Sequence, residues 1–84
     1  MLSAKMEDYL KAIYELQRES EDPVATSRIA ELLDVTAPTA TSMMEKLEER
    51  ELVEREKYKG VRLTPEGETV ALEVVRHHRL LGTY

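Results

Sequence analysis

The segment from Val35 to Leu47 constrains the fold most strongly, because it combines a clear helical pattern with a lack of charge. No charged residue lies between Val35 and Met44, although 35% of the chain is charged. Thr36 is a suitable N-cap, and Pro38 is tolerated in a first helical turn, where the amide that it lacks would be unpaired. The apolar residues recur at the spacing of one helical face, at Ala40, Met43, Met44 and Leu47. The sequence therefore predicts a helix over residues 36–50.

The opposite face of this helix carries small polar groups first and charged groups later. Its residues are Thr39, Ser42, Lys46 and Arg50. An uncharged hydroxyl face at a helix N-terminus can approach an acidic surface without repulsion, which favours the recognition helix of a helix-turn-helix. An ordinary amphipathic helix with a polar outer face is the alternative that this pattern alone leaves open.

Composition limits the class of protein. The 84 residues form one small domain, and the absence of cysteine excludes disulfides and thiolate metal sites. No apolar run is long enough to span a membrane, and charge from Lys5 onward argues against a signal peptide, so we expect a cytoplasmic protein. The net charge of −5 means that any nucleic-acid binding must depend on local charge.

Two helices are predicted before the central one. Ser3 can cap a helix that runs to about Glu19, and Thr26 can cap a short second helix. The inward residues of the second helix are predicted to be Ile29, Leu32 and Leu33. The turn 34–36 then leads into the third helix, which is the order of a helix-turn-helix.

A hairpin and a last helix are predicted to follow. Residues 52–55 and 61–63 read as strands, the turn 57–60 contains Gly60, and the segment 55–62 has a local charge of +3 from four basic residues and one glutamate. These charges suit DNA, or they protect a strand edge from pairing. Thr64 and Pro65 open the last helix, whose apolar stripe we expect to support self-association through Val70, Val74, His78 and Leu81.

Three strings resemble the metal-dependent repressors of the diphtheria toxin repressor family, which includes iron-dependent and manganese-dependent regulators. They are MEDYLKAIYEL, VTAPTATSMMEKLEERELV, and EKYKGVRLTPEG with VVRHHRLL. The resemblance implies a mainly α winged helix-turn-helix with a small β-hairpin. Residues 1–64 would form the DNA-binding domain, and 65–84 a helix leading to a dimerisation region absent from this chain. It implies a transcriptional repressor that binds operator DNA as a homodimer through helix 36–50 and wing 53–63.

The resemblance also implies DNA contacts in three places. The recognition helix would contribute Thr36, Pro38, Thr39 and Ser42. The start of the second helix would contribute Thr26, Ser27 and Arg28, and the wing Lys57, Tyr58 and Lys59. Ser42 replaces a glutamine of some relatives, so we expect little direct base readout there. Hydroxyls and helix-start amides suit phosphate oxygens, and threonine methyls suit thymine.

A metal site is implied only in part. Asp8 and His78 match ligand positions of the family, and a carboxylate with an imidazole suits Mn²⁺ or Fe²⁺. Lys11 and Gly82 stand where relatives have glutamate ligands, so we expect no complete site in this chain and metal sensing only in a longer parent protein. Alternatively, Asp8 and His78 are ordinary residues of solvated helix faces.

Other function classes fit the sequence less well. It contains no glycine-rich phosphate loop and no His-Glu-x-x-His pattern, and a serine with His77 or His78 does not make a triad, so we expect no enzyme. A winged-helix module that binds protein and neither DNA nor metal is the alternative, which the net charge of −5 favours somewhat.

Overall fold

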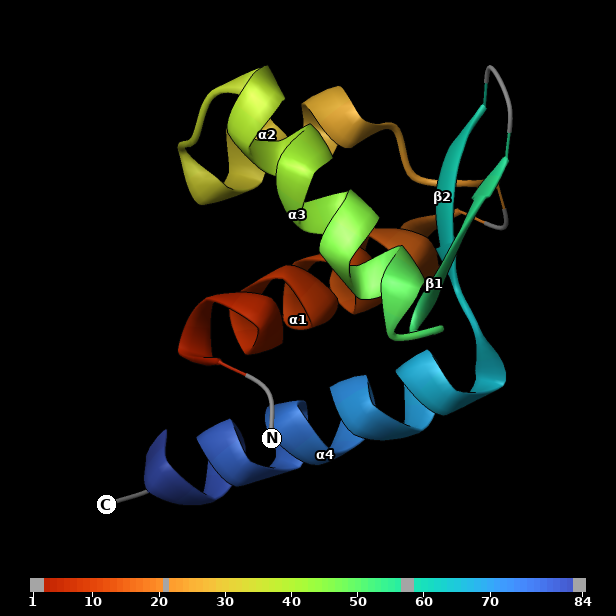
Figure 1. Ribbon diagram of the computed structural model, residues 1–84. Coiled ribbons are helices and arrows are strands. Elements are labelled where there is room, and N and C mark those ends of the chain that lie inside the picture. The colour runs from red at the N-terminus through yellow and green to blue at the C-terminus, as the bar shows by residue number, and fades with distance from the viewer. Residues whose placement is uncertain (1–2, 21, 57–58, 83–84) are drawn as a thin grey trace.

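Four helices and one hairpin make up the fold. The structure, a computed structural model, describes residues 3–20, 22–56 and 59–82, with side chains as far as Arg76. The elements are α1 (Ala4–Glu19), α2 (Thr26–Leu33), α3 (Ala37–Glu49), β1 (Val53–Glu56), β2 (Gly60–Leu63) and α4 (Pro65–Gly82). Figure 1 shows α1 in the middle, α2 and α3 on one side of it, α4 on the other, and the hairpin at one end. This arrangement confirms the predicted winged helix-turn-helix.

One core holds these layers together. The largest fully buried side chains come from five elements and are Leu10, Ile13, Ile29, Met44, Leu47, Val53 and Val61. Helix α1 supplies the centre, because it contacts α2, α3, α4 and β2. Burial beside this core raises the pKa of the Tyr9 phenol above its ordinary value, through desolvation. In the residues described, no helix combines the length and the apolar character needed to cross a membrane.

Two helices end in the same left-handed turn, and neither turn contains glycine. Asp34 after α2 has φ 56°, and Glu51 after α3 has φ 60°. In each turn the next amide reaches back five residues: Val35 N–H donates to Ala30 O at 3.0 Å, and Leu52 N–H to Leu47 O at 3.0 Å. These Schellman turns pair carbonyls that a helix end otherwise leaves without partners. They direct the chain sharply from α2 into α3 and from α3 into the hairpin.

The hairpin is attached to the rest of the molecule by a backbone bridge. Strands β1 and β2 pair antiparallel, from Val53 opposite Leu63 to Glu56 opposite Gly60. On the outer side of β2, Val61 exchanges two backbone hydrogen bonds of 2.8 Å with Val24, in the segment between α1 and α2. The predicted inward placement of Val61 and Leu63 is confirmed, because both are buried.

Helix α4 begins with a side-chain cap and packs on its own chain. The Gly67 amide donates to Thr64 Oγ1 at 2.9 Å, as predicted for a capping threonine. Val74 is buried and Val70 packs against the core. These two residues of the predicted self-association stripe are therefore occupied within the chain. The His78 and Leu81 side chains lie outside the described part.

Two local predictions are wrong. Leu32 is predicted to face inward but is 51% exposed, because α2 turns Ile29, Ala30 and Leu33 toward the core and leaves Leu32 at the edge. Thr26 is predicted to cap α2, but the N-cap is Ala25 and no side chain caps this helix. The first amides of α2 are therefore left without a side-chain acceptor.

The strained turn at Glu51 gives a stability prediction. We expect Glu51→Gly to stabilise the fold by about 1 kcal/mol, because glycine has no Cβ penalty in the left-handed region. Thermal denaturation should show a rise in Tm of roughly 4 °C or more. Glu45→Gly is the matched control, since the same change in the interior of α3 should lower Tm. A fall in Tm for Glu51→Gly would contradict this account of the turn.

Replacement of Gly60 is expected to destabilise the fold. Its φ is 133°, and a Cβ there would overlap the Val24 carbonyl oxygen. We expect Gly60→Ala to cost about 2–3 kcal/mol, because strain and backbone displacement add. Urea unfolding monitored by circular dichroism would measure this loss. An unchanged midpoint would show that the bridge to Val24 does not need close contact.

Candidate nucleic-acid interface

The first two turns of α3 present an exposed and uncharged surface. Thr36, Pro38, Thr39 and Ser42 are all exposed. Thr36 caps the helix by accepting a hydrogen bond of 3.3 Å from the Thr39 amide, and the two threonine hydroxyls are 2.8 Å apart. This pairing fixes both side chains at the helix start. Because a hydroxyl has one donor and two acceptor sites, each retains capacity for an outside partner.

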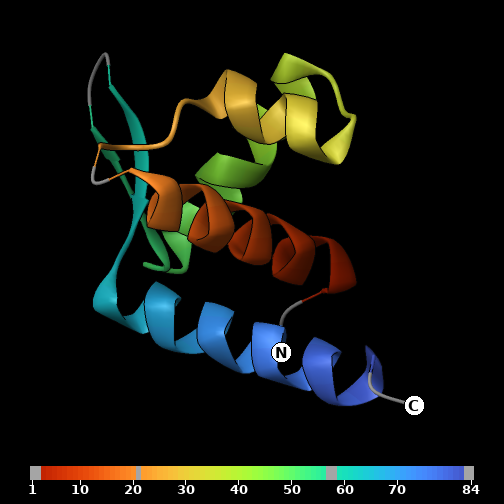
Figure 2. The ribbon, with the colours of Figure 1, turned by 180° about the vertical axis from the view of Figure 1, so that it is seen from behind.

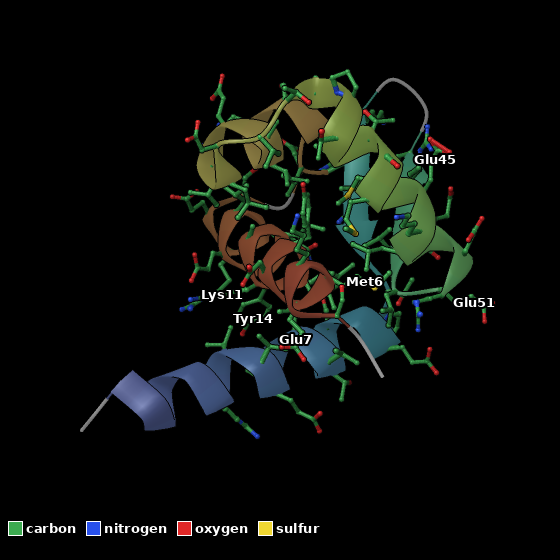
Figure 3. The ribbon with its side chains drawn as sticks, turned by 60° about the vertical axis from the view of Figure 1, so that its left-hand side comes forward. Met6, Glu7, Lys11, Tyr14, Glu45 and Glu51 are labelled. Carbon is green, nitrogen blue, oxygen red and sulfur yellow. The ribbon has the colours of Figure 1, made fainter. Side chains whose placement is uncertain are left out.

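The rest of α3 has a different electrostatic character. Glu45, Glu48 and Glu49 are exposed in its second half, where Lys46 is the helix's one basic residue. Figure 3 shows Glu45 projecting from α3 on the outer side of the molecule, and Glu51 projecting just beyond the helix end. A polyanion would therefore be accepted by the first half of α3 and repelled by the second half.

The start of α2 lies beside the hairpin, and its first amides have no side-chain acceptor. Because Ala25 is the N-cap, no side chain accepts from the first amides of α2. Thr26 is half-buried, while Ser27 and Arg28 are exposed. A shallow depression separates this helix start from the hairpin and is lined by residues that include Thr26, Lys59 and Gly60. Uncapped amides next to a lysine suit a phosphate oxygen.

The charges of the hairpin are partly compensated. Arg55 lies 3.8 Å from Glu48 of α3, and Arg62 lies 3.6 Å from Glu56. Lys59 is exposed and forms no ion pair within residues 3–20, 22–56 and 59–82. Lys57 and Tyr58 lie outside the described residues. Counting charge along the sequence missed the contact with Glu48, because it joins two elements.

The residues implied in metal binding do not form a site in the described part of the chain. Asp8, Lys11 and Glu15 line one shallow groove with Leu32 and Leu33. Figure 3 shows the Lys11 side chain extending away from the body of the molecule. An ammonium group cannot ligate a cation, and no group of three suitable donors occurs among the described residues. The His78 side chain lies outside them, so its pairing with Asp8 stays a prediction.

Comparisons with known proteins agree with this geometry. Residues 1–61 match the family model described as iron dependent repressor, N-terminal DNA binding domain. The chain is 40% identical over 84 residues to an HTH-type transcriptional regulator MntR of Oceanobacillus iheyensis, covering 56% of that protein. It is 40% identical over 74 residues to a diphtheria toxin repressor of Corynebacterium jeikeium, covering 88% of this chain and 30% of that one.

A solved structure supports the same assignment. The crystal structure of T. acidophilum IdeR superposes with a TM-score of 0.83 at 29% identity, over 94% of this chain and 37% of that one. The chain thus spans about half or less of the length of these three relatives. Because the family model covers most of the chain, the protein belongs to the iron dependent repressor family of transcriptional regulators and contains its N-terminal DNA-binding domain.

Proposed function

We propose that this chain binds double-stranded DNA as part of a cytoplasmic, non-enzymatic transcriptional repressor, and that two copies bind one operator. The first half of α3 enters the major groove, while the start of α2 and the hairpin lysines contact phosphates. The observation that carries this proposal is the uncharged, exposed surface of Thr36, Pro38, Thr39 and Ser42 on a chain with a net charge of −5.

The local distribution of charge on the surface supports the proposal more strongly than the net charge of the chain does. The acidic second half of α3 limits groove contacts to the first two turns, where hydroxyls and the Pro38 ring are available. These groups are short, so direct base readout is modest and phosphate contacts supply much of the affinity. Lys59 and Thr26, at the uncapped start of α2, line the same depression, so one phosphate backbone can contact both.

A protein-binding module is the second candidate function. The salt dependence of the affinity for DNA distinguishes it from DNA binding. DNA binding through lysines releases counterions, so affinity falls steeply as salt rises. Fluorescence anisotropy with a labelled duplex at low and physiological salt distinguishes them. Binding that ignores salt, or no binding at low salt, would contradict the DNA proposal.

The wing gives a prediction about non-specific affinity. We expect the double variant Lys57→Ala/Lys59→Ala to weaken binding to all duplex sequences similarly and to reduce the salt slope by about 2, one for each lysine. Lys5→Ala, compared with Lys59→Ala alone, is the control for the loss of one positive charge. Lys5 is exposed at the start of α1, and Figure 1 shows this end of α1 on the opposite side of the molecule from the hairpin. A changed sequence preference in the double variant would instead make the wing a base reader.

Metal dependence belongs to the proposal for a longer parent protein, with Asp8 and His78 as candidate ligands for Mn²⁺ or Fe²⁺. One structural relative is the manganese regulator SloR, which is 38% identical to this chain. For the 84-residue chain alone, we expect calorimetry to detect no Mn²⁺ binding tighter than millimolar, and EDTA to leave DNA affinity unchanged. Micromolar binding that Asp8→Asn and His78→Ala each abolish would show that these two residues hold the ion despite Lys11.

A further inference from the structure

The side chain of Gln17 joins three elements that are far apart in the sequence. Its Oε1 accepts a hydrogen bond of 3.0 Å from the Leu63 amide of β2. Its Nε2 donates to Glu68 Oε1 of α4 at 3.2 Å. Figure 2 shows the place of this junction, where the end of α1, the base of the hairpin and the start of α4 come together.

The contact with β2 completes the outer edge of that strand. Successive amides of a strand point to opposite sides, so those of Val61 and Leu63 point away from β1. The Val61 amide pairs with the Val24 carbonyl, and the Leu63 amide pairs with Gln17. Leu63 is 4% exposed, so its amide depends on this side chain. Gln17 thus occupies the place of a neighbouring strand.

The contact with α4 follows from the same geometry. A carboxamide has one acceptor end and one donor end, so an Oε1 directed at the Leu63 amide leaves Nε2 free to donate. Glu68 lies in the first turn of α4 and accepts from it. The two ends of the carboxamide cannot be exchanged, because a flipped amide would place Nε2 against the Leu63 N–H and Oε1 against the Glu68 carboxylate. A shift of α4 therefore acts on β2 through this amide.

We infer that Gln17 is a positioning residue for DNA binding, which holds the wing at a fixed place relative to α4. The inference rests on the proposed function, because the wing matters only if its lysines contact phosphate. Gln17 itself does not need to reach DNA. Its effect is to keep Lys59 on the side of the molecule where α2 begins.

The test exchanges the hydrogen-bond donor and acceptor between Gln17 and Glu68. Gln17→Glu keeps the acceptor for Leu63 but places a carboxylate against Glu68, and we expect it to weaken binding to a duplex about tenfold. Gln17→Glu/Glu68→Gln restores a donor opposite an acceptor at the wild-type net charge, and should recover affinity to within about twofold. Gln17→Glu/Glu73→Gln has the same net charge without the restored pair, and should stay weak. Glu73 is exposed on α4.

Two further measurements separate positioning from general stability. Hydrogen exchange by NMR should show faster exchange of the Leu63 amide in Gln17→Leu and near-normal protection in Gln17→Glu/Glu68→Gln. Lys59→Ala should weaken DNA binding in the wild type but much less in the Gln17→Glu background, because a displaced wing no longer uses that lysine. All affinities are compared at a temperature at which thermal melts show each variant folded.

The outcomes are distinct. The inference is overturned if Gln17→Glu binds like wild type, if the Glu73 control recovers affinity as well as the Glu68 variant, or if Lys59→Ala has the same effect in both backgrounds. If the wild type binds no duplex at low salt, the proposed function fails and the role of Gln17 in DNA binding fails with it. If the wild type binds a duplex and the Gln17 variants bind equally well, the inference about Gln17 fails while the proposed function stands.

Discussion

The pair of backbone hydrogen bonds between Val24 and Val61 is the constraint on which the geometry of the proposed DNA-binding surface depends. A two-stranded hairpin is too small to be stable alone, so its position must come from contacts with the helices. The bridge attaches β2 to the segment that leads directly into α2. The start of α2 and the hairpin are therefore held side by side, and the absence of a side chain at Gly60 allows the close approach.

An acidic protein can bind a polyanion if its charges are separated in space, and this fold separates them within a single helix. Thr36 to Met44 carries no charge, whereas Glu45, Glu48 and Glu49 follow. The exposed ion pair of Glu48 with Arg55 places one of these carboxylates beside an arginine of β1. The exposed pair is worth little as stability, but it shows how an acidic helix end and a basic hairpin can lie together while Lys59 keeps its charge available.

The sequence predicted most of the fold, because helix spacing and turn residues are local signals. Thr36 and Thr64 cap helices as predicted, and Gly60 has a positive φ, although it is the first residue of β2 and not part of the turn. The prediction that Leu32 faces inward is wrong, because periodicity in an eight-residue helix does not show which edge of the helix the neighbouring elements cover. The contacts of Gln17 and of Arg55 were not predicted either, because each joins elements whose proximity depends on tertiary packing. Of the residues expected at DNA, those on the first two turns of α3 are exposed together, namely Thr36, Pro38, Thr39 and Ser42.

Helix α4 is tied at its first turn to both elements of the proposed DNA-binding surface, and this has a mechanical consequence. Thr64 Oγ1 donates to the Glu51 carbonyl at the end of α3, at 2.8 Å, and Gly67 packs against the Leu52 carbonyl. Gln17 ties the same turn to β2 through Glu68. A displacement of α4 would therefore strain the end of the recognition helix and the base of the wing together. Any partner that moves α4 would change both proposed contacts with DNA at once, so coupling to the proposed DNA binding requires no separate path to each element.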